Sequence, residues 1–430
     1  MRTRELGLVT IRRLLLLAAC VLAAPAAECA SDDPLEAPDP SEYIRWGPVR
    51  ARPGLVVSNL GKDDNVFFAT GTETPRSDYR VTVGGRLEGL VLFGDRAFLT
   101  FDERLNYTLY DKYGSTTTNP DGEKVPSQNY LSQFLTSRVT FPFSGWGVFA
   151  DVDFIETETR PTSEFNGRVD QQVERAGMGF IVELGWRTYA EFERSRSDWS
   201  YDERDRPETA AKLNRLEQRN LFRVNYRLTG LTRLTFDTAL VEYSFDDDTG
   251  RDSTQLQLLP GFTLGEGARL SGSVQIGYSQ FDVQDPEKGD FDSTVGAASI
   301  RYRMGSGTTL RLDGGRDVGF AVFDENTFYL NRFAEARVTH YFNSIVGGTF
   351  AGYYGKLSYP QEMGFRIDTN REYELGVLFR ALQTQGGKVV EYGLTWRRAS
   401  RDSVTGDPPA PDPDLTQSRS VWGFTANAGF

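Results

Sequence analysis

Histidine chemistry rests on a single residue in this chain, His340. Many hydrolases and acyltransferases use a histidine as general base, so this residue is the first to test for catalysis. The surrounding pattern places it close to a short turn at Phe342. No catalytic triad, zinc-ligand spacing or phosphate-binding glycine loop accompanies it. We therefore expect no enzyme activity, no metal site and no cofactor.

Charged residues recur at every second position in many stretches, as in Arg86 and Glu88 or in Arg311 and Asp313. A period of two places such side chains on one face of a β-strand. We predict that they line a water-filled interior. The predicted lumen-lining set is Arg80, Arg86, Glu88, Asp102, Arg104, Arg187, Glu191, Arg223, Arg233, Asp237, Arg311, Asp313, Arg337, Glu391 and Arg397. The alternative role of each is a cross-strand ion pair that stabilises the wall and touches no solute.

Apolar residues occupy the other phase of the same stretches, at residues 79–91, 99–109, 222–228 and 270–278. Each stretch is long enough to cross a bilayer when tilted. Only 39% of the residues are apolar, and the mature chain has no apolar run near the roughly 20 residues of a membrane helix. Strands that face lipid on one side and water on the other fit this composition.

Connections between these stretches alternate in length. Short ones lie at 94–95, 142–145, 183–185, 229–231, 265–267, 305–307, 342–344 and 384–387. Long polar ones lie at 61–77, 111–126, 157–171, 197–217, 246–252, 282–290, 314–326, 357–370 and 399–416. This rhythm predicts an all-β protein, a transmembrane up-and-down antiparallel β-barrel of about 18 strands over residues 49–430. The short turns would be periplasmic and the long loops extracellular, with 197–217 a candidate constriction.

The last strand ends on an aromatic residue, Phe430, with Phe424 and Trp422 in the same phase. It resembles the closing strand of bacterial outer-membrane barrels, in which the terminal aromatic is part of the signal for insertion. That resemblance implies recognition by the barrel-assembly machinery and integral location in the bacterial outer membrane.

The first residues predict export. Basic residues from Arg2 to Arg13, an apolar run from Leu14 to Ala24 and the small residues up to Ala26 form a signal peptide, residues 1–26. The alternative is a lipoprotein signal ending at Cys20. Cleavage after Ala26 leaves a single cysteine, Cys29, so no intramolecular disulfide is expected. Residues 27–48 would form a short periplasmic tail, with no plug domain before the barrel.

Aromatic residues near strand ends predict girdles at headgroup depth, at Trp146, Trp186, Tyr278, Tyr302, Trp396 and Trp422. Others have the inward phase and could form a sugar-stacking track, namely Tyr110, Phe134, Phe149, Tyr189 and Tyr243. Glu103 has the lipid-facing phase, which indicates a bulge or a subunit contact. The expected surroundings are membrane lipid and lipopolysaccharide. A net charge of −12 gives no basic face for nucleic acid.

Residues 45–50, Arg-Trp-Gly-Pro-Val-Arg, lead to the segments 61–67 and 77–79. These three segments resemble the start of the β-barrel porins encoded beside bacterial exopolysaccharide biosynthesis and export genes. The resemblance implies a conduit for secretion of an exopolysaccharide or capsular polysaccharide, working with a periplasmic polysaccharide export protein. Two alternatives remain open from the sequence, a passive nutrient porin and a structural or assembly barrel without transport.

Overall fold

The computed structural model describes residues 34–430, apart from residues 72, 126 and 430 and the segments 119–123, 161–164, 166–167, 203–209, 248–249, 266–267, 323–326, 360–365, 384–388, 406–409 and 413–414. The predicted signal peptide and Phe430 therefore lie outside the described residues. Within the described part of the chain, no helix is long and apolar enough to cross a membrane.

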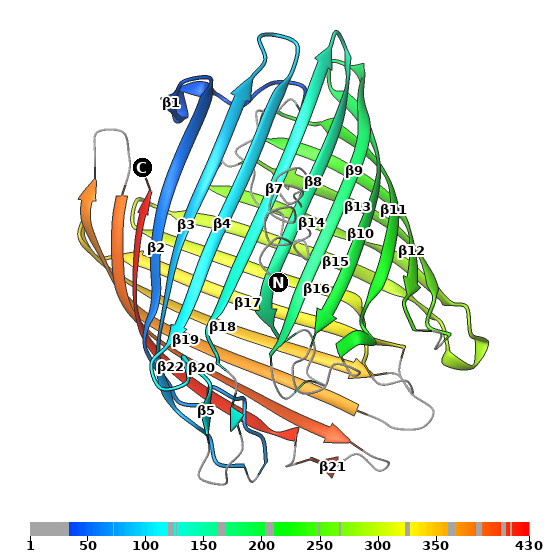
Figure 1. The fold of residues 1–430 in the computed structure, drawn as a ribbon. Coiled ribbons are helices and arrows are strands. Elements are labelled where there is room, and N and C mark those ends of the chain that lie inside the picture. The colour runs from blue at the N-terminus through cyan, green and yellow to red at the C-terminus, as the bar shows by residue number, and fades with distance from the viewer. Residues whose placement is uncertain are drawn as a thin grey trace, which may run out of the picture.

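Eighteen long antiparallel strands form the wall, as the sequence rhythm predicted (Figure 1). They are β2 (Val49–Asp63), β3 (Asp78–Leu92), β4 (Phe98–Tyr110), β7 (Tyr130–Phe143), β8 (Trp146–Thr159), β9 (Val169–Gly185), β10 (Thr188–Asp202), β11 (Arg215–Arg227), β12 (Thr232–Phe245), β13 (Ser253–Leu264), β14 (Leu270–Val283), β15 (Phe291–Met304), β16 (Thr308–Phe320), β17 (Phe328–Tyr341), β18 (Val346–Tyr359), β19 (Arg366–Gln383), β20 (Val389–Thr405) and β22 (Gln417–Gly429).

Several short strands and turns lie beside the wall strands. β1 (Ile44–Trp46) pairs with β2 and β21 (Ala410–Pro411) pairs with β20, while β5 (Thr117–Thr118) and β6 (Lys124–Val125) form a separate hairpin. Two 3₁₀ turns, η1 (Pro40–Glu42) and η2 (Pro286–Lys288), complete the described elements.

Each wall strand pairs with its neighbours in the chain, and the ladder between β2 and β22 closes the ring. Closure pairs every strand on both sides, which a bilayer demands because it offers backbone groups no water. Several strands extend farther toward the long loops than the sequence indicated. β10 continues to Asp202 and β16 to Phe320. In β10, buried and exposed side chains still alternate up to Asp202, with different residue types on the two faces.

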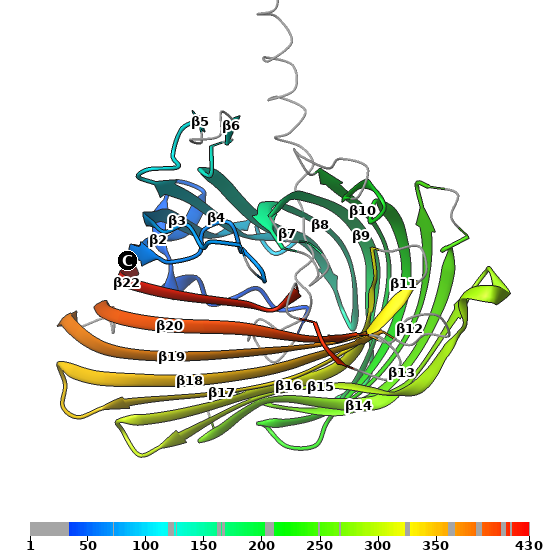
Figure 2. The same ribbon diagram turned by 90° about the horizontal axis from the view of Figure 1, so that it is seen from below.

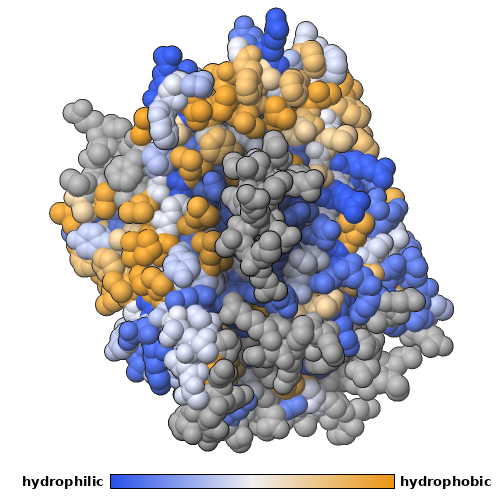
Figure 3. Space-filling view, in the orientation of Figure 1, coloured by the Kyte–Doolittle hydropathy of each residue, from blue (hydrophilic) through white to orange (hydrophobic). Residues whose placement is uncertain are grey.

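The outer surface carries the apolar phase of the strands. In β12, Leu234, Phe236 and Leu240 are exposed, whereas Asp237 and Ala239 between them are buried. Figure 3 shows apolar residues gathered over the upper part of one face, the end that bears the short turns, with hydrophilic residues more frequent toward the long loops. This distribution is that of a barrel with a lipid-facing belt.

The closing ladder contains a bulge. The pairing of β2 with β22 shifts between Val57 and Leu60, and its pairing with β3 shifts between Ser58 and Gly61. Asn59, inside the bulge, has a φ of 56°. Asparagine adopts this left-handed conformation more readily than most residues. Glu103, in contrast, lies outside any register shift: its Oε1 accepts a hydrogen bond from Gln133 Nε2 at 3.1 Å.

Replacement of Gly61 by alanine should prevent proper closure of the barrel. A Cβ at this position would lie 1.8 Å from the backbone oxygen of Trp422, so the closing strands would have to separate. We expect a loss of about 3 kcal/mol or more in the free energy of unfolding in lipid vesicles. Gly352→Ala is the matched control, because its Cβ would meet nothing within 4 Å. Equal stability of the two variants, measured by urea titration, would contradict this role of Gly61.

Candidate functional site: the charged lumen

The polar phase of the strands faces the interior of the barrel. Arg215 of β11 lies over the ring of Phe320 in β16, with 4.8 Å between the guanidinium carbon and the ring centroid. Because these strands are five apart in the wall, this contact crosses the interior. Residues that share the phase of Arg215 along β11, such as Arg223 and Asn225, therefore point inward.

One side of the inner wall, β8–β12, holds a dense set of buried ion pairs. Arg175 contacts Asp151 at 2.7 Å, Asp153 at 2.5 Å and also Glu193. The side chains of these four residues are only 8–14% exposed. One cation thus neutralises part of the charge of three carboxylates that are largely removed from water.

Three members of the predicted lumen-lining set join the same side. Arg223 forms a two-pronged pair with Asp237, with both N–O distances at 2.9 Å. Glu191 lies 3.6 Å from Arg223 and accepts a hydrogen bond from Arg138 at 3.0 Å. The carboxylates of Glu191 and Asp237 are only 7–9% exposed, so their main contacts are with arginines of the neighbouring strands.

The ion pairs of β3 and β4 are more open. Arg86 binds Asp102 at 2.9 Å and Glu88 at 2.7 Å, and Arg104 binds Asp102 at 2.7 Å. The Arg86 and Arg104 side chains are 43% and 48% exposed. These pairs combine cross-strand neutralisation with access to water.

Strands β16–β20 repeat that open arrangement. Arg311 contacts Asp313 at 2.7 Å and Arg337 contacts Glu374 at 2.5 Å. Arg397 contacts Glu372 at 2.5 Å and has a half-exposed side chain. These ion pairs are therefore mostly buried along β8–β12 and more exposed on β3, β4 and along β16–β20.

The remaining predicted residues have varied positions. Arg80 lies 3.7 Å from Asp63, Arg233 lies over the ring of Tyr189, and Glu391 accepts a hydrogen bond from the Tyr341 hydroxyl. Arg187 is a correction: it lies in the turn between β9 and β10, not on a strand, and stacks 3.9 Å from the centroid of Trp186. Its turn position follows from the end of β9 at Gly185.

Sequence reasoning missed several inward charges, including Asp63, Arg138, Arg175, Glu372, Glu374 and Arg419. The sequence predicts Asp63 in the loop 61–77, but it is the last residue of β2 and is fully buried against Arg419 of β22. Asp63 and Arg419 lie at strand ends, where extending the two-residue period would have found them, whereas the other four lie within β7, β9 and β19, strands over which that period was not followed.

Two predicted insertion-signal residues, Trp422 and Phe424, have the outward phase. Trp422 is 53% exposed and its ring lies 6.0 Å from that of Trp396. Phe424 packs near Tyr392 on the same face. His340 lies on β17 near its turn, where Thr308 Oγ1 is 2.7 Å from the imidazole Nδ1. Among the described residues, no group of histidine, cysteine or acidic side chains could hold a metal ion.

An apolar cluster fills part of the lumen near the long loops. Val173, Trp199 and Leu213, from three neighbouring strands and loops, pack with Val322 from the loop after β16. The ladder between β15 and β16 ends at Gly296 and Arg316, so the end of β16 leaves the wall. The end of β16 and the start of β17 form a hairpin that bends inward. Figure 2 shows its yellow ribbon close to the green strands β9–β11. The hairpin thus narrows the lumen from inside.

A fully buried arginine fastens this arrangement. Arg251, in the loop between β12 and β13, donates from Nη1 to the backbone oxygen of Lys212 at 2.7 Å and from Nη2 to that of Ala321. Its guanidinium also lies 4.5 Å from the centroid of Phe245. One side chain therefore links three long loops at the mouth of the barrel.

A second group of loop contacts lies around Phe68. The guanidinium groups of Arg160, Arg168 and Arg419 lie 5.6, 5.4 and 4.5 Å from the centroid of this ring. Arg160 also donates to Gln417 Oε1 at 2.5 Å. Burial, with Arg401 nearby, lowers the pKa of Arg160 to about 9. Cation–π contacts thus hold the loop after β2, through Phe68, against the loop after β8 and the start of β22.

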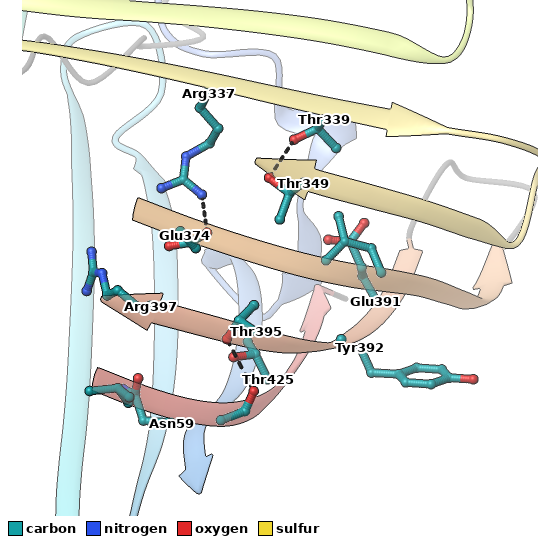
Figure 4. Close-up of a pocket in the computed structure, with 14 residues that line it drawn as sticks. Asn59, Arg337, Thr339, Thr349, Glu374, Glu391, Tyr392, Thr395, Arg397 and Thr425 are labelled. Carbon is teal, nitrogen blue, oxygen red and sulfur yellow. Dashed lines mark hydrogen bonds and ion pairs between the residues drawn. The ribbon is translucent and has the colours of Figure 1, made fainter. Parts of the chain in front are cut away.

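Two cavities lie on the hydrated side of the inner wall. The first holds about 350 Å³ and is lined by Arg337, Glu374, Glu391, Arg397 and several threonines (Figure 4). The second holds about 400 Å³ and is lined by Arg301, Arg303, Thr309, Thr339, Tyr341 and Arg380. Thr339 borders both, so the two spaces follow one another along the wall.

Removal of Arg175 should destabilise the barrel strongly. Arg175→Met would leave Asp151, Asp153 and Glu193 buried without their shared cation, at a cost of about 3 kcal/mol or more in the free energy of unfolding. Arg371→Met breaks a pair whose side chains are 45% and 48% exposed, and it should cost less than about 1 kcal/mol. Urea titration of both variants in vesicles provides the comparison, and similar losses would contradict the assignment.

Removal of Arg251 should loosen the loops at the mouth. Arg251→Ala leaves the carbonyls of Lys212 and Ala321 without this donor, so we expect a higher single-channel conductance and faster cleavage of the loops by added protease. Lys288→Ala, in the loop between β14 and β15, is the control and should leave both unchanged. A wild-type conductance in Arg251→Ala would show that this arginine does not limit the opening.

Comparison with known proteins gives one family match. The model of the family described as "Putative beta-barrel porin 2" matches residues 157–384. No curated protein matches the chain.

Several solved structures of barrels are similar in part. A BenF-like porin from Pseudomonas fluorescens Pf-5 has 12% identity and a TM-score of 0.48, covering 88% of this chain and 98% of that one. OccK2 (OpdF) from Pseudomonas aeruginosa has 13% identity and a TM-score of 0.45, with the same coverage. OccAB4 from Acinetobacter baumannii has 10% identity and a TM-score of 0.44, again with 88% and 98% covered.

Proposed function

Because the chain belongs to the "Putative beta-barrel porin 2" family, we propose that it is a passive outer-membrane porin for small hydrophilic solutes. A solute would move down its own concentration gradient through water in the lumen. No covalent step is involved. The residues of the charged lattice would act by setting the electrostatic potential along the path.

The observation that carries this proposal is the hydrated side of the lumen. There, the side chains of Arg311, Arg337 and Arg397 are 34–50% exposed while each remains paired with a carboxylate. Paired charges stabilise the wall and still offer hydrogen bonds to passing solutes. The cavities of about 350 and 400 Å³ beside them provide room for small molecules.

Export of a polysaccharide is the function that the sequence resemblance favoured. The contacts at the mouth favour the alternative, a small-solute porin, because Val322 and Arg251 tie loops across the interior. A polymer would need that region to open along its whole path. We do not propose a polysaccharide or a periplasmic export protein as partners; lipid, lipopolysaccharide and the assembly machinery remain the proposed partners.

Purified protein should form passive channels in planar lipid bilayers. We expect discrete unitary current steps, because the lumen is polar and its exposed charges are paired. In a liposome-swelling assay, the rate should fall from a monosaccharide to a trisaccharide, and dextran should be excluded. Heat-unfolded protein is the control. Absence of current steps, or swelling in dextran at the rate seen with a monosaccharide, would contradict the proposal.

A further inference from the structure

The bulge in β2 turns one polar side chain toward the lumen at the seam of the barrel. Asn59 lies where the ladders to β3 and β22 both shift in register, and its backbone has a left-handed φ of 56°. Bulges commonly redirect a side chain next to a functional site.

The amide of Asn59 borders the first cavity together with Thr339, Thr349 and Thr395 (Figure 4). Its contacts within the protein are long: 3.4 Å from Nδ2 to each of the Ser58 and Thr82 hydroxyls, and 3.5 Å from Arg80 to Oδ1. These lengths lie at or beyond the limit of good hydrogen bonds. The amide can therefore exchange them for contacts with a solute at little cost.

The charges around this cavity cancel within the wall. Arg337 is paired with Glu374 at 2.5 Å, and Arg397 with Glu372 at 2.5 Å. Glu391 accepts from the Tyr341 hydroxyl and lies 3.6 Å from Arg380. A solute with a net charge would have to compete with these pairs. A neutral solute with several hydroxyl groups can instead use the threonine hydroxyls, the amide and the unused edges of the pairs.

Hydrogen bonding, without aromatic stacking, would supply the binding. The ring of Tyr392 points away from the labelled polar side chains in Figure 4, and it stacks 5.3 Å from the ring of Phe379. Net hydrogen bonds in water are individually modest, so occupancy would be brief. Brief occupancy suits a site that solutes must leave as well as enter.

We propose that this seam cavity is a solute-binding site of the channel and that it takes a small neutral polyhydroxylated molecule, such as a sugar ring or a linear polyol. This inference rests on the proposed porin function. The opposite side of the lumen is filled by buried ion pairs and by the apolar cluster, so the solute path follows the seam side. Asn59 and Thr349 are the residues that contact the solute.

Glucose block of ionic current through single channels tests the site. Asn59→Gly removes the amide but keeps a residue suited to a φ of 56°, and Thr349→Val removes a hydroxyl at constant shape. Each should raise the glucose concentration needed for half-maximal block by about threefold to tenfold, the range of one lost hydrogen bond. Thr140→Val, at a buried position on β7, is the matched control and should leave the block unchanged. Altered electrophoretic migration on heating confirms that each variant is folded.

The outcomes separate this inference from the proposed function. Channels that conduct but show no glucose block, or a block equally strong in all four proteins, overturn the seam site and leave the porin. Block by glycine or by acetate but not by glucose overturns the assigned solute class. Wild-type protein that folds without conducting overturns both proposals.

Discussion

Backbone hydrogen bonding in a lipid environment is the constraint on which this structure depends. A bilayer offers no water to unpaired peptide groups, so the wall must close on itself. The ladder between β2 and β22 satisfies that requirement by pairing the first and the last strand of the wall. Close packing of Gly61 against Trp422, and the buried pair of Asp63 with Arg419, make the closure specific.

Closure also separates two environments with opposite demands. The outer face presents apolar side chains to lipid, and the inner face must place many charges around a confined space. The wall solves this in two ways. On β8–β12 the charges are buried and shared, as around Arg175, whereas along β16–β20 they remain paired but hydrated. This difference packs the charges of β8–β12 into the wall and leaves the paired charges along β16–β20 exposed to the lumen.

Sequence periodicity predicted the wall well, because the alternation of side chains is a local property of each strand. It also placed Arg223 with Asp237 and Arg86 with Glu88 in the inward phase in which they pair. It did not predict the inward hairpin after β16, the role of Arg251 or the bulge at Asn59. Each of these depends on contacts between segments far apart in the chain, such as Arg251 with Ala321. Neither charge nor period at a single position carries that information.

The seam has a kinetic consequence for how the molecule assembles. Asp63 and Arg419 are 356 positions apart, and every other wall strand lies between them in the sequence. Bringing such distant segments together lowers the conformational entropy of the chain before the new contacts can stabilise the closed wall. Pairing of β2 with β22 therefore joins the wall strands that are farthest apart in sequence, and it carries the largest loop-closure cost of any ladder in the wall.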